Sequence, residues 1–257
     1  SEFVSYRLGF HAEYTTHVSI MNGIGELAKK YKAPVYAHNS ETLSETKECI
    51  ERHGYTPTEL MERAGVFEYG GGGFHCVCMS DEDVALMAEK KLWAVTCPAS
   101  NLKLASGIAP IDRLAAAGVP LAIGTDGAGS NNALDMFREM YLVSALQKYL
   151  NSDASAGSAD RTLEMACVGG ARAMGLADCD DLAAGKRADL IVIGLDRPNM
   201  QPVNNIARNI VYSGSKDNVR LTMVNGKILY ENGEFFLDES ADDIYARCGE
   251  WRKKIVG

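Results

Sequence analysis

Three histidines and one aspartate lie at equivalent places along the chain, each at the carboxyl end of a short apolar segment. They are His11, His38, His75 and Asp126. If the apolar segments are parallel strands, their carboxyl ends meet at one edge of a sheet, which is where α/β proteins gather their catalytic residues. One buried structural histidine is unremarkable, but this repetition is not. It predicts that His38, His75 and Asp126 share a cavity.

The residue types in this set suit a divalent metal. Neutral imidazoles combined with a carboxylate bind Zn²⁺ and similar borderline cations. A catalytic site of that kind keeps one position open for water and lowers the pKa of that water to about 7. We therefore expect one divalent cation, zinc before others, at His38 and Asp126, with His75 as an optional third ligand. The alternative is a structural pair in which His38 and Asp126 bond to each other.

Two neighbouring side chains extend the predicted cavity. Glu41 lies three residues after His38 and is placed to transfer a proton as a general acid or base; its alternative role is an acid at a helix start. Asp126 has the alternative role of capping a turn, but the polar run at 130–132 favours a site loop. Within that run, Ser130 is expected to contact a substrate.

The other histidines and the cysteines receive no catalytic role. His17 lies near a predicted helix start and His53 near a helix end, where a surface cation is common. The seven cysteines lack framework spacing, which indicates reduced thiols and a cytoplasmic location. Cys76 and Cys78 are expected to share one face of a strand and to act as packing residues.

Bulk properties exclude several classes of partner. The formal charge of −8, without any basic run, argues against nucleic acid. No apolar stretch reaches the roughly 18 residues that a membrane span requires, and the first four residues do not resemble a secretory signal. A small-molecule partner is the expectation that remains.

The first two-thirds of the chain alternates strand-like with helix-like segments. This pattern predicts βα units on a parallel sheet. Ser80 begins an acidic first turn and is the predicted N-cap of its helix, whereas the glycine run at 70–73 is expected to be a loop. The predicted strands are 4–10, 34–37, 74–77, 92–97 and 119–124, and the predicted helices are 18–31, 44–53, 58–64, 80–91, 111–117 and 134–149.

The remainder of the chain has a different character. An apolar strand at 190–193 precedes two strands, 219–224 and 227–230, that flank Asn225-Gly226, the preferred pair for a type I′ hairpin turn. A helix at 160–174 bridges the two parts, and the polar tail at 238–254 is predicted to be helical. We expect a partial hydrolase barrel at 1–175, a small β unit at 176–236 and a helical tail at 237–257.

Taken in order, the segments resemble the amidohydrolase superfamily, specifically the methylthioadenosine/S-adenosylhomocysteine deaminases and their chlorohydrolase relatives. The resemblance extends to about residue 236, and its most specific stretch is the run at 98–110. The matching stretches are FHAEYT at 10–15, HNSET at 38–42, HCV at 75–77, PASNLKLASGIAP at 98–110, GTDGAGSNN at 124–132, GKRADL at 185–190 and VNGK at 224–227.

The resemblance implies a role for each residue of the predicted cavity. The residue that matches His38 binds the metal, and the match to Asp126 binds the metal and accepts a proton from the attacking water. The match to Glu41 protonates the ring nitrogen of the heterocycle, and the match to His75 lies beside the metal and polarises the attacked centre or orients the nucleophile. The match to His11 contacts the nucleoside portion of the substrate. The implied reaction is hydrolytic deamination of an adenine-type nucleoside.

The same resemblance implies a (β/α)8 barrel with a small β-sandwich, and the chain departs from it in three places. No His-x-His pair occurs, although the family's first barrel strand ends in one, and only about five of the eight strands are found. Thr96-Cys97 and Cys78 stand where relatives often carry histidine. We expect the carboxyl-terminal portion of such an enzyme, with weak or absent metal binding and with open sheet edges that favour a homo-oligomer.

Two other functions remain open from the residues alone. The same site could hydrolyse a different leaving group, such as a halide or an alkylamine on a triazine or pterin ring. A non-enzymatic function would be a self-associating half-barrel without metal. Ammonia release and metal content distinguish the three.

Overall fold

The structure is a computed structural model that describes residues 4–256. Its larger sheet has five parallel strands that follow one another in sequence order, so each βα unit adds a strand beside the previous one. This confirms the parallel sheet that the alternating pattern predicts. The strands are β1 (Leu8–Gly9), β2 (Val35–Asn39), β3 (Gly71–His75), β4 (Trp93–Thr96) and β5 (Leu121–Ile123).

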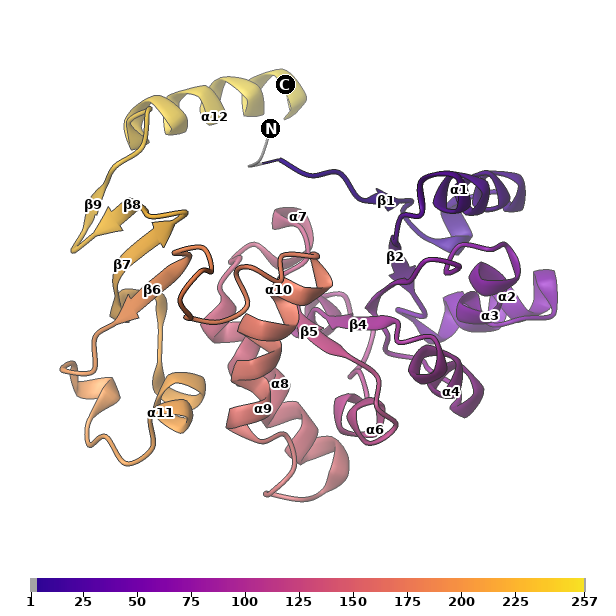
Figure 1. Cartoon of the computed structure of the whole chain (residues 1–257), viewed down its shortest axis with the longest axis horizontal. Helices are drawn as coiled ribbons and strands as arrows, with labels where there is room; N and C mark the ends of the chain where they lie inside the picture. Colours follow the sequence, from indigo (N-terminus) through magenta and orange to yellow (C-terminus); the bar gives the residue numbers. More distant parts are fainter. Residues whose placement is uncertain (1–3, 257) are drawn as a thin grey trace.

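Helices follow each strand and cover one side of the sheet (Figure 1). Buried residues of these helices, such as Met21, Met61 and Leu114, form one core with the strands. Ser80 caps its helix as predicted, and Thr42 and Thr56 close capping boxes of the same kind. The helices are α1 (Val18–Tyr31), α2 (Leu43–His53), α3 (Pro57–Arg63), α4 (Asp81–Glu89), α5 (Pro98–Lys103), α6 (Ile111–Ala116), α7 (Ala128–Asn131) and α8 (Met136–Asn151).

Two strand predictions were wrong in their bounds. Of the predicted strand at 4–10, residues Leu8–Gly9 form β1. The glycine run at 70–73 is not a loop, because Gly71, Gly72 and Gly73 belong to β3. Glycine is needed there: a Cβ at Gly72 would lie 2.1 Å from the carbonyl oxygen of Trp93 on the next strand. Close backbone approach selects glycine in a strand, and composition alone suggests a loop.

The second sheet is antiparallel, in the order β6-β7-β8-β9. Its hairpin turns at Asn225 and Gly226, both with positive φ, as the type I′ prediction requires. A last helix, α12 (Ala241–Val256), follows at the edge of the molecule and buries none of its side chains (Figure 1). The strands are β6 (Leu190–Ile193), β7 (Val219–Val224), β8 (Lys227–Glu231) and β9 (Glu234–Phe235).

The helical segment between the sheets is continuous but not uniform. The predicted helix at 160–174 comprises α9 (Ala159–Glu164), a π-helical turn at Met165–Gly169 and α10 (Gly170–Ala173). Gly169 lies against the backbone of β5, since a Cβ there would be 2.2 Å from the carbonyl oxygen of Leu121. A further helix, α11 (Ile206–Ser213), packs against α8 and α9. Within residues 4–256 no helix has the length and hydropathy needed to cross a bilayer.

Candidate metal centre and catalytic site

The predicted cavity residues meet at the carboxyl rim of the parallel sheet. His38 comes from β2, His75 ends β3, and Asp126 follows β5. One potential ligand atom from each lies within 4.8 Å of the other two. The rings of His38 and His75 are stacked, with centroids 5.1 Å apart. The expectation that these three side chains converge is therefore confirmed.

Both imidazoles are held through the nitrogen that faces away from the cluster. Nδ1 of His38 lies 2.7 Å from the backbone oxygen of His11, and Nδ1 of His75 lies 2.6 Å from Oδ1 of Asn101. Because each oxygen is an acceptor, each Nδ1 carries the hydrogen, and each Nε2 keeps its lone pair. Outer contacts of this kind are what orient histidine ligands of metals. The residues present thus fit a divalent cation.

Asp126 is held ionised by hydroxyl groups. Ser100 and Ser130 each donate to its Oδ2, at 2.5 Å in both cases. Burial acts to raise the pKa of Asp126, but these two hydrogen bonds and one from the backbone of Gly127 outweigh it, so the pKa lies below its usual value. Oδ1 is not used by these serines. One carboxylate oxygen is therefore fixed while the other is available to a ligand.

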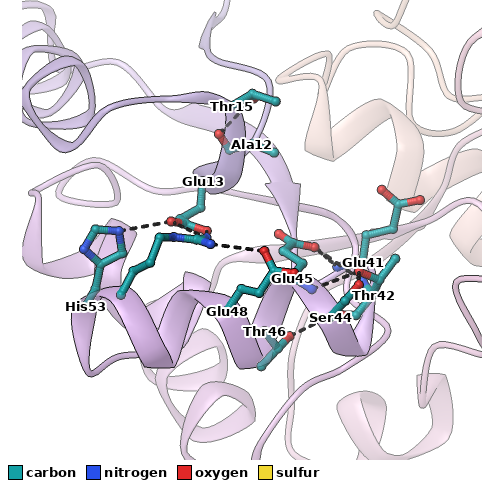
Figure 2. A network of polar contacts seen from close by, with 11 residues as sticks. Ala12, Glu13, Thr15, Glu41, Thr42, Ser44, Glu45, Thr46, Glu48 and His53 are labelled. Atoms are coloured by element: carbon teal, nitrogen blue, oxygen red, sulfur yellow. Dashed lines mark hydrogen bonds and ion pairs between the residues drawn. The ribbon is translucent and has the colours of Figure 1, made fainter.

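Glu41 points into the site and does not cap the following helix. Its Oε1 accepts a hydrogen bond of 2.9 Å from Ser106, and its Oε2 lies 3.8 Å from Nε2 of His75. The helix acid is Glu45 instead, which accepts from the backbone nitrogen of Glu41 at 2.7 Å and closes the capping box with Thr42. Figure 2 shows the Glu41 carboxylate directed away from this capping network. The helix-start alternative for Glu41 is thereby excluded.

The loop that carries His11 is anchored to the far end of α2. Glu13, whose side chain is 2% exposed, accepts from Arg52 at 2.7 Å and lies 3.2 Å from His53 (Figure 2). The ring of His11 lies beside that of His38, with centroids 4.6 Å apart and the ring planes tilted by 39°. The backbone oxygen of His11 also accepts from the backbone nitrogen of His38. The Glu13 contact thus fixes the segment that orients His38.

Burial of His75 sets its protonation. Desolvation lowers the pKa of His75 below its usual value, although the carboxylate of Glu41 and the contact with Asn101 act in the opposite direction. The ring is 1% exposed. At neutral pH His75 is therefore an uncharged imidazole, which is the form that binds metals.

The backbone is unusual where the site residues leave the sheet. Ser40, His75 and Asp126 have φ values of 49°, 69° and 59°. Left-handed backbone is costly for residues other than glycine, and it persists where the surroundings enforce it. In each case it turns the chain sharply at a strand end. Two of these three residues, His75 and Asp126, belong to the cluster with His38.

Several supporting residues were missed by sequence reasoning, namely Asn101, Ser100, Ser106 and Glu13. The first three belong to the stretch at 98–110, whose close match to the resembled family was the signal that could have found them. Two assignments also need correction. Cys76 follows β3 in left-handed backbone, so Cys76 and Cys78 do not share a strand face, and His53 pairs with a buried carboxylate. His17 is the N-cap of α1 and is not part of the cluster of His38, His75 and Asp126.

Comparison with known proteins identifies the family. Residues 1–229 match the model of the amidohydrolase family. The chain belongs to this family. It is 40% identical to the 5-methylthioadenosine/S-adenosylhomocysteine deaminase of Moorella thermoacetica, and 38% identical to that of Thermoanaerobacter pseudethanolicus. These matches cover 95% and 90% of this amidohydrolase, but 57% and 54% of the two relatives.

Solved structures show the same fold. An adenosine deaminase from Xanthomonas campestris with bound zinc is 33% identical and superposes with a TM-score of 0.93, over 99% of this amidohydrolase and 58% of that chain. The atrazine chlorohydrolase from Arthrobacter aurescens, solved with zinc, is 24% identical with a TM-score of 0.83, over 91% and 52% of the two chains. The partial barrel and partial sandwich predicted from the sequence are confirmed as the fold class. The division at residues 175 and 236 stays a prediction.

Proposed function

We propose that this chain carries the carboxylate and imidazole residues of a hydrolytic deaminase that acts on adenine-type nucleosides, with methylthioadenosine and S-adenosylhomocysteine as the nearest chemical models. The single observation that carries the proposal is the convergence of His38, His75 and Asp126, with Glu41 opposite them. The names of the relatives and the adenosine deaminase neighbour support the choice of leaving group and substrate class.

We propose that the cluster holds one divalent cation, with zinc the first choice. His38 and Asp126 would bind it, and His75 offers a third ligand through Nε2. A cation there supplies a water of lowered pKa as the nucleophile. Catalytic zinc sites have three protein ligands. Two of the three candidates here, His75 and Asp126, are oriented by side-chain hydrogen bonds with Asn101 and Ser100. We expect binding that a strong chelator reverses.

The protein groups would divide the proton transfers. Asp126, ionised and held by Ser100 and Ser130, accepts a proton from the attacking water. Glu41 donates a proton to the ring nitrogen of the heterocycle, and Ser106 keeps its carboxyl group directed into the site. His75, neutral because it is buried, orients the nucleophile, and His11 contacts the nucleoside portion. The proton taken up by Asp126 would then pass to the amino group, which leaves the attacked ring carbon as ammonia, and Glu41 would recover its proton from the hydroxyl group that becomes the product's carbonyl.

Ammonia release and zinc binding test the proposal. Zinc uptake is measured by equilibrium dialysis for the unaltered chain, for His38→Ala and Asp126→Asn, and for His17→Ala as a control that is not a member of the cluster. Because the His-x-His pair is missing, we expect weak uptake of at most one equivalent, lost in the first two variants and kept in the control. Ammonia is assayed with adenosine, methylthioadenosine and S-adenosylhomocysteine, and Glu41→Gln should lower its release at least about 100-fold.

Chloride and alkylamine release from substituted triazines is assayed in parallel with ammonia release from the nucleosides. Turnover of triazines without any ammonia from nucleosides would replace the deaminase proposal by hydrolysis of another leaving group. Zinc binding that is unchanged in His38→Ala would contradict the proposed metal site. Division of the chain at residues 175 and 236 is a further proposal, and limited proteolysis near these positions tests it.

A further inference from the structure

The two imidazoles of the site are fixed by different kinds of acceptor. Nδ1 of His38 faces a backbone carbonyl, which can only accept a hydrogen bond. Nδ1 of His75 faces the side-chain amide of Asn101 at 2.6 Å, and both residues are 1% exposed. An amide offers either its oxygen or its NH₂ group. The orientation of Asn101 therefore decides which nitrogen of His75 carries the hydrogen.

We propose that Asn101 is a positioning residue that holds His75 in the tautomer with its hydrogen on Nδ1, so that the lone pair of Nε2 faces His38 and Asp126. The inference rests on the proposed function, because a lone pair at that place matters only if the site binds a cation or a water molecule. Turning the amide over would place a hydrogen on Nε2. Such a ring could not be a metal ligand.

The contact between His75 and Glu41 agrees with this tautomer. Nε2 of His75 and Oε2 of Glu41 are 3.8 Å apart, which is beyond hydrogen-bonding distance. A hydrogen on Nε2 would favour a short charge-assisted bond to that carboxylate, at about 2.7–2.9 Å. The Glu41 carboxylate instead accepts from Ser106. Nothing at this end of the ring competes with the hydrogen on Nδ1.

The NH₂ group of Asn101 shows which end of the amide is required. Its Nδ2 is buried and has no hydrogen-bond partner among residues 4–256, and the same is true of Nδ2 of Asn39 on the strand beside His75. A buried polar group without a partner is unfavourable, so the residue is tolerated for another contribution. That contribution is the acceptor oxygen. A leucine would fit the same space without leaving an orphaned donor, but it would leave Nδ1 of His75 without an acceptor.

Two consecutive residues of α5 bind two site side chains, one as a hydrogen-bond donor and the other as an acceptor. Ser100 donates to Asp126, and Asn101 accepts from His75. The backbone nitrogen of Asn101 donates to the backbone oxygen of Cys97, the N-cap residue of α5, so Asn101 lies in the first turn of this helix. Two residues of one short helix thus orient the carboxylate of Asp126 and the imidazole of His75. Each of these two groups keeps an acceptor atom that faces the cluster.

Nitrogen NMR of the histidine rings tests this assignment directly. Long-range ¹H–¹⁵N spectra of the zinc-free chain, recorded where His75 is neutral, report which nitrogen is protonated. Three proteins are compared: the unaltered chain, Asn101→Asp, which keeps an acceptor, and Asn101→Leu, which has none. We expect hydrogen on Nδ1 in the first two and a shift of population toward Nε2 in Asn101→Leu.

Zinc affinity provides a second measurement. We expect affinity to fall at least about tenfold in Asn101→Leu and to stay within a few-fold in Asn101→Asp. A hydrogen on Nε2 of His75 in the unaltered chain overturns the proposal, and that spectrum decides it even if Asn101→Leu does not fold. An unchanged tautomer in folded Asn101→Leu also overturns it. If the tautomers follow expectation but no protein binds zinc, the proposed metal site fails while the role of Asn101 stands.

Discussion

Around the parallel sheet several polar side chains are fully buried, whereas the polar side chains of the antiparallel strands lie partly or wholly in solvent. His75, Asn101 and Glu139 are at most 1% exposed. The strands β6 to β9 contain no fully buried residue among those described, and α12 buries none. In residues 176–256 the buried polar side chains of the described chain are Asp180 and Asn218.

The difference shows where orientation matters in this protein. Burial removes water as an alternative partner, so the direction of a buried polar side chain beside the parallel sheet is set by the protein group that it contacts. Exposed groups of the second sheet can exchange partners with water at little cost. Matched substitutions in the two regions should therefore differ greatly in effect.

The largest difference is expected for glycine substitutions. Gly72→Ala in β3 places a Cβ 2.1 Å from the oxygen of Trp93, so the two strands must separate. We expect a loss of at least about 3 kcal/mol in the free energy of unfolding, or no folded protein. Gly249→Ala in α12 meets no atom of the described residues within 4 Å and should be neutral or stabilising by up to about 1 kcal/mol. Urea unfolding measures both, and equal effects would refute the comparison.

An intermediate difference is expected for ion pairs. Glu13→Gln leaves Arg52 and His53 without the buried carboxylate they contact, and we expect a loss of about 2 kcal/mol, less than for a fully buried pair because the Arg52 side chain is 40% exposed. Glu239→Gln removes an exposed pair with Arg247 and should not change the melting temperature measurably. The double variant Glu13→Gln/Arg52→Met should recover part of the loss. No recovery would show that Glu13 acts through packing alone.

The smallest difference concerns the pH and salt dependence of two carboxyl groups. Burial raises the pKa of Glu139, against hydrogen bonds from Ala99 and Asn131, whereas the hydrogen bond from Arg220 lowers the pKa of exposed Asp196. Glu139 therefore favours the folded state below its unfolded pKa, and this contribution is lost as the pH rises through its folded pKa. Asp196 contributes above its unfolded pKa and loses that contribution as the pH falls through its folded pKa.

Salt separates the two causes. High ionic strength should return the pKa of Asp196 toward its usual value, because that pair is exposed, and should leave the pKa of Glu139 nearly unchanged. Carboxyl-carbon NMR titrations at low and high salt provide the measurement. A salt-sensitive Glu139 would mean that charges, and not burial, dominate in the parallel sheet.

Much of the fold follows from local patterns. The alternation of apolar segments with capped helices predicted the parallel sheet, and Asn225-Gly226 predicted the hairpin. The placement of His38, His75 and Asp126 at strand ends predicted their convergence, because parallel strands share one carboxyl rim. These signals depend only on the order of residues and on the spacing of apolar residues, and both can be seen within a short stretch of sequence.

The partners that orient the site could not be predicted in this way. Asn101 lies 26 residues from His75, and Ser106 lies 65 residues from Glu41. By composition the glycines of β3 favour a loop, and the need for glycine there is visible only when the strands on both sides are in place. Residue type and order decided which side chains reach the rim of the sheet. Only tertiary structure decided which atom of each faces the cavity, because that direction depends on hydrogen-bond partners brought together by packing of distant segments.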